Sequence, residues 1–173
     1  FSYSANAYCA NETDPIPTVT GTAGGTFTST PATGITIDAS TGTIDLDAST
    51  PGTYTVQYLT PGICPDSSTT DVTINGMDDP AFSYDQADYC TNETDPIPTV
   101  TGTAGGTYSA TPTGISLDAS TGTIDLDAST PGTYTIQYLT PGICPDSSTT
   151  DVTINGMDDT AFNYDQTAYC AND

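Results

Sequence analysis

Polar and apolar residues alternate along several short stretches of this chain, and no stretch shows the 3.6-residue period of a helix. The alternation is clearest in residues 52–60, where Tyr54, Val56 and Tyr58 point to one face and threonine and glutamine point to the other. The turn at residues 39–42 ends in a glycine that can supply a positive φ. The stretches of this kind in the first part of the chain are 1–8, 15–20, 26–30, 34–38, 43–47, 52–60 and 69–74.

The chain is built from a repeat. The run GTIDLDASTPGTYT at residues 42–55 returns letter for letter at 122–135, and a unit of about eighty residues is written twice and begun a third time. About seven short strands per unit predict an all-β fold of tandem Ig-like β-sandwich domains. Three paired differences keep apolar bulk at positions expected to face inward: Phe27/Tyr108, Ile37/Leu117 and Val56/Ile136. The predicted organisation is an Ig-like repeat at 1–77, an acidic joint at 78–81, a second repeat at 82–157, a second joint at 158–161, and the first strand of a third repeat at 162–173.

The charge of the chain excludes some classes of binding partner. The formal net charge is −22, and there is no lysine, arginine or histidine. Such a chain cannot neutralise phosphates, so nucleic acid is excluded as a partner, and anionic membrane surfaces repel it. No apolar run approaches the roughly 18 residues that span a membrane, so direct membrane insertion is not expected. The first residue is Phe1 rather than methionine, which indicates a processed N-terminus or a window on a longer protein.

A resemblance covers essentially the whole chain. The run GITIDASTGTIDLDASTPGTYTVQY at residues 34–58 is followed by a Cys-Pro loop and a TDVTI strand. This pattern resembles the tandem Ig-like repeats of bacterial cell-surface adhesins, and above all those of large Bacteroidota surface and gliding-associated proteins. The resemblance implies secretion to the bacterial cell surface, repetition along a stalk or adhesin, and no catalytic residues.

The five cysteines are Cys9, Cys64, Cys90, Cys144 and Cys170. Each complete repeat holds two, which predicts disulfides Cys9–Cys64 and Cys90–Cys144, each worth about 4 kcal/mol on the chain-entropy model, in an oxidising compartment. Cys170 then pairs with a following repeat. A rival pairing, Cys64–Cys90 with Cys144–Cys170, staples neighbouring domains and leaves Cys9 for another neighbour. Buried free thiols are the remaining alternative.

Acidic pairs mark the two joints, at Asp78 and Asp79 and again at Asp158 and Asp159. Clustered carboxylates and carbonyls are the ligands that calcium prefers, so these four residues are candidate calcium ligands at the domain joints. The run MDDPAF at residues 77–82 faintly resembles the calcium-binding linkers of cadherin repeats, without most of their other ligands. The alternative is a solvated acidic surface.

Sugar chemistry has a few candidate positions. Thr160 lies in an Asp-Thr-Ala triplet that resembles a Bacteroidota O-glycosylation motif. Asn11 and Asn92 fit the N-glycosylation triplet, which in a bacterial protein is usually a polar turn. Tyr8 and Tyr89, each beside a cysteine, are either exposed platforms for sugar stacking or residues that pack on a disulfide.

The function expected from these observations is structural. Without histidine or lysine there is no ordinary base to activate a nucleophile, and Asp45 and Asp47 on a flat strand make a poor carboxylate pair, so no enzyme activity is expected and no cofactor is required. The leading interpretation is a repeat module of a long extracellular stalk, adhesin shaft or filament, with neighbouring copies of the repeat as partners. The alternatives are a glycan-binding adhesin module that recognises a surface glycan, or a filament subunit whose first strand is exchanged head to tail.

Overall fold

The computed structural model describes residues 1–162, and this part of the chain is all-β, without a helix. Two compact units form. Unit 1 contains Phe1–Ala81, Val100–Gly106 and Leu139–Ser148, and unit 2 contains Phe82–Thr99, Thr107–Tyr138 and the described residues from Thr149 onward. The first repeat holds the strands β1 (Ala7–Cys9), β2 (Thr26–Thr30), β3 (Thr36–Ile37), β4 (Ile44–Asp45), β5 (Gly52–Leu59) and β6 (Ser67–Asn75).

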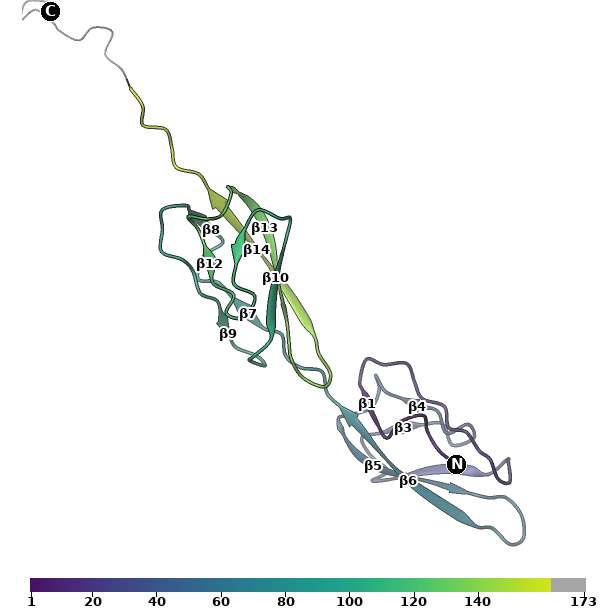
Figure 1. The fold of residues 1–173 in the computed structure, drawn as a ribbon. Helices are drawn as coiled ribbons and strands as arrows, with labels where there is room; N and C mark the ends of the chain where they lie inside the picture. The colour runs from purple at the N-terminus through teal and green to yellow at the C-terminus, as the bar shows by residue number, and fades with distance from the viewer. Residues whose placement is uncertain (163–173) are drawn as a thin grey trace, which may run out of the picture. The chain divides into compact units, whose positions relative to one another are not determined.

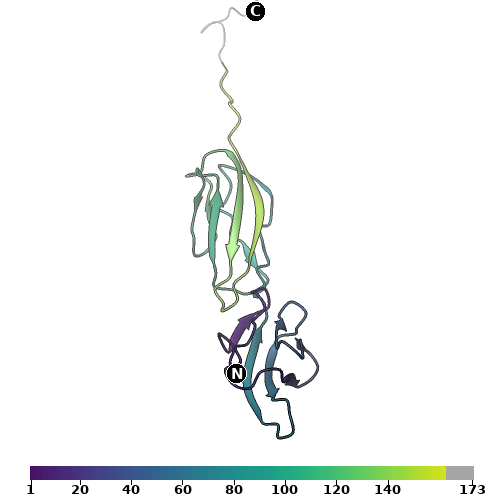
Figure 2. The same cartoon turned by 90° about the vertical axis from the view of Figure 1, so that its right-hand side faces the viewer.

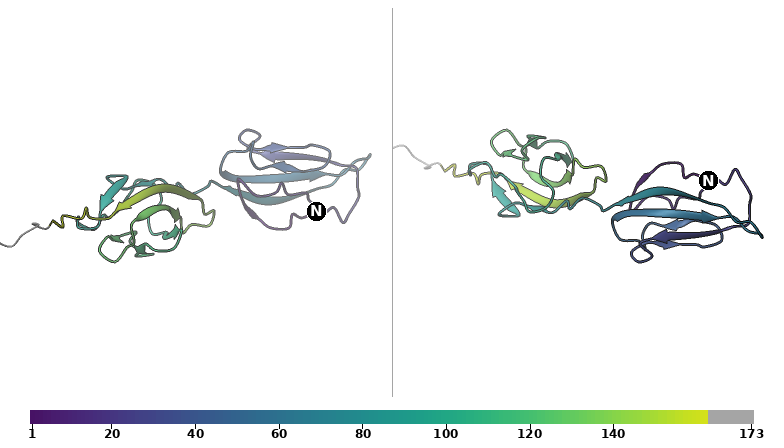
Figure 3. Two further views of the ribbon diagram at one scale, coloured as in Figure 1. Left: turned by 90° about the horizontal axis from the view of Figure 1, so that it is seen from above. Right: turned by 90° about the horizontal axis from the view of Figure 1, so that it is seen from below.

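The first repeat is a two-layered sandwich. One layer is a four-stranded sheet in the order β1-β6-β5-β2, and the other contains the β3–β4 ribbon (Figure 1). Strands β5 and β2 pair antiparallel to their neighbours, whereas β1 runs parallel to β6. The strands of each sheet can be followed from other sides in Figure 2 and Figure 3. This parallel pairing decides which end of the sheet receives the first cysteine.

The core lies between these layers. Tyr54 and Val56 of β5 face inward and are at most 4% exposed, and they meet Ile44 and Leu46 of the other layer, which are fully buried. Phe27 and Tyr58 add aromatic bulk, with ring centroids 4.7 Å apart. The alternation seen in the sequence is therefore confirmed as the division between core and solvent faces.

The second repeat has the same design. Its strands are β7 (Phe82–Ser83), β8 (Asp88–Cys90), β9 (Thr99–Val100), β10 (Thr107–Thr111), β11 (Ser116–Leu117), β12 (Ile124–Asp125), β13 (Gly132–Leu139) and β14 (Ser147–Asn155). The main sheet has the order β10-β13-β14-β8, and β8 again runs parallel to the last strand. The inward positions Tyr108 and Ile136 are buried, while Leu117, like Ile37 in the first repeat, is half-buried.

Some expected strands are shorter than the alternation predicts. The predicted strand 1–8 becomes β1 preceded by an isolated bridge between Ser2 and Thr18, and the predicted strand 15–20 contributes only that bridge in the first repeat. Pro15 and Pro17 have no N–H to give to a ladder, so pairing is confined to Thr18. The predicted third repeat lies, apart from Phe162, outside the described residues, and the predicted domain bounds stay a prediction.

The turn between β3 and β4 is closed by Asp38. Its Oδ1 accepts hydrogen bonds from the backbone N–H of Ser40 at 2.8 Å, the Ser40 hydroxyl at 2.7 Å and the N–H of Thr41 at 2.8 Å. Gly42 completes the turn with φ 75°, a value that favours glycine. The hydrogen bond from the Ser40 hydroxyl, followed by those from the backbone, lowers the pKa of Asp38 to about 2.

We expect a Ser40→Ala variant to raise the pKa of Asp38 toward its ordinary value of 3.8, because the largest cause of its lowering is removed. Since the folded-state pKa is depressed, the ionised Asp38 contributes stability above about pH 4, and this contribution is lost as the pH falls through 2. Carbon-13 NMR titration of the carboxyl groups measures the shift. Asp118, which has the same partners in the second repeat and a pKa of about 2, is the internal control and should not move. An unchanged Asp38 titration would contradict the assignment.

Candidate functional site

Cys9 is placed by the parallel pairing of the first strand. It lies opposite Asn75, the last residue of β6, and the backbone N–H of Ala10 donates to the Asn75 carbonyl at 3.0 Å. Cys9 is therefore held at the C-terminal end of the last strand of its repeat. It is 8% exposed.

Cys144 is placed by the loop between β13 and β14. The base of this loop is closed by two hydrogen bonds, from the Thr140 N–H to the Asp146 carbonyl at 3.0 Å and from the Asp146 N–H to the Thr140 hydroxyl oxygen at 2.8 Å. These bonds make the five residues between Thr140 and Asp146 a defined turn rather than an open loop. Cys144 at its tip is 2% exposed.

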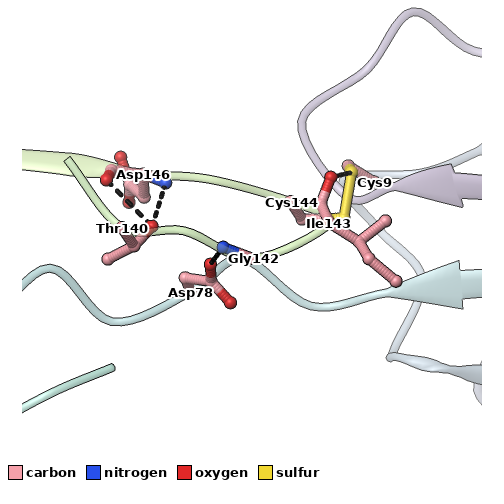
Figure 4. The surroundings of a disulfide bond; sticks show 7 residues. All are labelled: Cys9, Asp78, Thr140, Gly142, Ile143, Cys144 and Asp146. Carbon is pink, nitrogen blue, oxygen red and sulfur yellow. Dashed lines mark hydrogen bonds between the residues drawn. A yellow bond between two sulfur atoms is a disulfide. The ribbon is translucent and has the colours of Figure 1, made fainter. Parts of the chain in front are cut away.

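A disulfide joins these two cysteines across 135 residues of sequence, with Cα atoms 5.5 Å apart. Both belong to unit 1, because Leu139–Ser148 of the second repeat is part of that compact unit. The bond thus ties a loop of the second repeat to the first (Figure 4). The Cys9 sulfur also lies 3.6 Å from the Ile143 carbonyl oxygen, which is a contact and not a hydrogen bond, because a disulfide sulfur carries no hydrogen.

Hydrogen bonds around the disulfide hold the same loop against the predicted joint. The Asp78 N–H donates to the Cys144 carbonyl at 3.0 Å, and the Gly142 N–H donates to Asp78 Oδ2 at 2.8 Å (Figure 4). The Ser148 hydroxyl donates to the Pro80 carbonyl at 2.5 Å. A Cβ on Gly142 would overlap the Asp78 carboxylate, so a larger residue here would have to displace that carboxylate. The joint is a disulfide reinforced by reciprocal hydrogen bonds.

The predicted disulfides Cys9–Cys64 and Cys90–Cys144 are wrong, because the structure pairs Cys9 with Cys144 and leaves Cys64 and Cys90 as free thiols. The physical reason is the parallel pairing of the first and last strands of each repeat. Cys64 precedes β6 and Cys9 lies at its other end, so the nine residues of β6 separate them by roughly 25 to 30 Å. A disulfide needs Cα atoms within about 7 Å. The rival pairing through Cys64–Cys90 is also absent, and Cys170 lies outside the described residues.

The acidic candidates have backbone partners. Besides the contact of Asp78 with Gly142, Asp79 Oδ1 accepts the N–H of Ala81 at 3.0 Å and Asp159 Oδ1 accepts the N–H of Ala161 at 2.7 Å, while Asp158 is exposed. Within residues 1–162, no group of three or more histidine, cysteine or acidic side chains gathers to hold a metal ion. Calcium takes six to eight oxygen ligands, backbone carbonyls among them, so calcium binding at these joints stays a prediction.

The tyrosines beside the cysteines are not exposed platforms. Tyr8 is 7% and Tyr89 3% exposed, and both belong to the buried cores. The Tyr89 hydroxyl donates to Asp85 Oδ1 at 2.5 Å, and burial, with this hydrogen bond second, raises the pKa of Tyr89 to about 12. Tyr89 is therefore a neutral donor that fixes the start of its repeat.

The candidate glycosylation residues and the search for membrane-spanning helices complete the description of the sites. Thr160, Asn11 and Asn92 are exposed, and their modification stays a prediction. In the part of the chain that the structure describes, there is no helix of the length and apolarity needed to cross a membrane.

No protein-family model matches the chain, and the search of curated proteins finds no match either. Solved structures similar to it include mouse cadherin-23 EC22-24, at 17% identity with a TM-score of 0.35, covering 91% of this chain and 64% of that one. Mouse protocadherin-24 EC1-3 is similar at 12% identity with a TM-score of 0.38, again covering 91% of this chain and 64% of that one. The chain thus spans a little less than two thirds of the length of these structures, and at such identities and scores no family membership follows.

Proposed function

We propose that this chain is a non-catalytic structural repeat module of a long extracellular stalk, adhesin shaft or filament on a bacterial cell surface. The observation that carries the proposal is the Cys9–Cys144 disulfide, which links one sequence repeat covalently to the next. A binding or catalytic domain needs no such link between its copies. In an array that transmits tension such a link has a use, because a bond between repeats limits how far the chain can be extended.

The mechanical consequence follows from the position of the bond. Tension applied at the two ends enters the disulfide at Cys9 and leaves it at Cys144, which are 135 positions apart, so the segment between them carries no load through its own backbone. Unfolding of that segment then cannot lengthen the molecule. Removing the bond exposes the whole segment to extension.

The surface chemistry supports an extracellular place for such an array. Disulfides persist in oxidising compartments and are rare in the cytosol. The net charge of −22 without a single basic side chain keeps neighbouring molecules apart and discourages sheet edges from sticking to one another. Both properties suit many similar domains crowded outside a cell.

The two alternative functions have less support. A glycan-binding module loses its candidate stacking platforms, because Tyr8 and Tyr89 are buried. Head-to-tail exchange of the first strand between chains is also less supported, since β1 and β8 each pair with the last strand of their own repeat.

The proposal predicts the extension of a single molecule. When the chain is pulled from its two ends, the oxidised form should withhold the length of 135 residues, at about 3.5 Å each or roughly 470 Å, and a reductant should release it. Force spectroscopy measures this difference in contour length. A Cys144→Ser variant should give the full extension without reductant, and a Cys64→Ser variant, which removes an exposed free thiol, should behave as the parent chain. Equal extension with and without reductant would overturn the tension-bearing role.

A further inference from the structure

The joint around Cys9 and Cys144 accounts for only two of the cysteines in the described residues. Cys64 stands in the sequence PGICPD, which is identical to the loop that carries Cys144, and Cys90 follows a tyrosine as Cys9 does. Cys64 is exposed and Cys90 is partly exposed, and both are free thiols. Each therefore has the local sequence of one half of the Cys9–Cys144 joint without its bond. We call the loops 60–66 and 140–146 plugs, and the segments that receive them, 9–10 with 75–80 and 90–91 with 155–160, sockets.

Neither half can be completed inside its own repeat. The register Cys90 with Asn155 repeats the register Cys9 with Asn75, so every socket cysteine lies at the C-terminal end of the last strand. Every plug precedes that strand, at its other end. A repeat of this design can use its two cysteines only by bonding to two other copies.

The unused plug is preformed at its base and differs at its tip. The Thr60 N–H donates to the Asp66 carbonyl at 2.9 Å and the Asp66 N–H to the Thr60 hydroxyl at 2.8 Å, as in the bonded plug. At the tip, Gly62 has φ 113°, whereas the equivalent Gly142 is not among the glycines with positive φ. Cys64 is exposed where Cys144 is buried. The same seven residues thus have a closed base that accepts two tip conformations, one of them the bonded one.

The unused socket is likewise preformed and uncovered. The Thr91 N–H donates to the Asn155 carbonyl at 3.1 Å, which matches the bond from Ala10 to Asn75 in the used socket. Met157 is 63% exposed and Asp158 is exposed, whereas their equivalents Met77 and Asp78 are half-buried. The second socket therefore carries the same residue types as the first, with its methionine and aspartate more exposed.

We propose that Cys64 and Cys90 are connector thiols, and that each bonds to a further copy of this repeat through the plug-and-socket joint seen between Cys9 and Cys144. The inference rests on the proposed structural function and names its partner. The further copy belongs either to the same polypeptide or to a second one, and the chemistry of recognition is the same. In this joint Asp158 accepts the N–H of the incoming plug glycine, as Asp78 accepts that of Gly142.

The bond-forming step needs an oxidant, which a small disulfide such as oxidised glutathione supplies by thiol–disulfide exchange. The Cys90 thiolate attacks oxidised glutathione, forms a mixed disulfide and releases one glutathione thiolate. The Cys64 thiolate of the incoming plug then attacks the Cys90 sulfur and releases the second. In total, two thiols and one oxidised glutathione give one protein disulfide and two reduced glutathiones.

The test uses the full 173-residue chain with Cys170→Ser in every variant, so that Cys64 and Cys90 are its only free thiols. With oxidised glutathione, this chain should give a ladder of disulfide-linked oligomers on a non-reducing gel. Chains with Cys64→Ser or Cys90→Ser should each stay monomeric, and an equimolar mixture of the two should give dimers and stop there. Peptide mapping of the dimer should find Cys64 joined to Cys90. On the gel, the mixture should contain at least tenfold more dimer than either variant alone.

Specificity is tested at the socket carboxylate. Asp158→Ala should lower the rate of dimer formation several-fold, while Asp159→Ala, which removes a contact local to its own turn, should leave that rate unchanged. The further copy can belong to the same polypeptide or to a second one, and a chain lengthened by a copy of residues 82–161 distinguishes these two cases. If the partner is the next repeat of the same polypeptide, Cys90 of this longer chain should form its disulfide within the chain even at high dilution. Equal amounts of Cys64–Cys64, Cys90–Cys90 and Cys64–Cys90 links would overturn the inference. That outcome would leave the proposed function standing, since all these variants keep Cys9 and Cys144.

Discussion

A Cys144→Ser variant is expected to unfold with about 5 kcal/mol less free energy than the parent chain, because the lost bond closes a loop of 135 residues. On the chain-entropy model, the denatured chain regains the freedom that this cross-link removed. Urea unfolding followed by circular dichroism measures the change, as the sheets are the whole of the secondary structure among the described residues.

Further cysteine variants separate the effect of losing the Cys9–Cys144 disulfide from the effect of losing a cysteine side chain. Cys9→Ser should cost as much as Cys144→Ser, and the double variant should cost no more than either alone, because all three remove the same bond. Cys64→Ser, at an exposed free thiol, should stay within about 0.5 kcal/mol of the parent. Additive losses from the two single variants would mean that the cysteines act independently of their bond.

The sheet was largely predictable from the sequence because burial has a period of two along a strand. Tyr54, Val56 and Tyr58 alternate with polar residues, and all three are buried in β5 as expected. The predicted strand 26–30 has the same bounds as β2. Where the alternation is short or interrupted by proline, as at Pro15 and Pro17, the sequence overstates the strands, because alternation does not report whether a backbone partner is present.

The joint was not predictable in the same way. Which cysteines pair depends on the direction in which β1 runs against β6, and nothing in three strand residues, Ala7–Cys9, encodes parallel rather than antiparallel pairing. Counting cysteines per repeat favours a bond within each repeat, and the parallel register forbids that bond by placing Cys9 at the far end of β6 from Cys64. The sequence shows the charge of the acidic pair at the joint, but not that Asp78 accepts a hydrogen bond from the Gly142 N–H.

The core itself should be sensitive to loss of side-chain volume. An Ile44→Ala variant is expected to lose about 3 kcal/mol of unfolding free energy, within the range of roughly 2 to 5 found for such truncations. Ile44 is fully buried between the layers of the first repeat, in one cluster with Tyr54, Val56 and Val72. The truncation removes apolar contacts and leaves a cavity, while the backbone bond from the Ile44 N–H to the Pro15 carbonyl is kept.

Ile16→Ala is the matched control, because the same atoms are removed from a side chain that is 69% exposed, and its cost should stay within about 0.5 kcal/mol. Ile124→Ala, at the equivalent fully buried position of the second repeat, should cost as much as Ile44→Ala. Urea unfolding measures all three variants. If Ile16→Ala and Ile44→Ala lower the unfolding free energy by the same amount, the layers do not enclose the core described above. If Ile124 alone proves tolerant, the two repeats, despite their nearly identical sequences, do not pack alike.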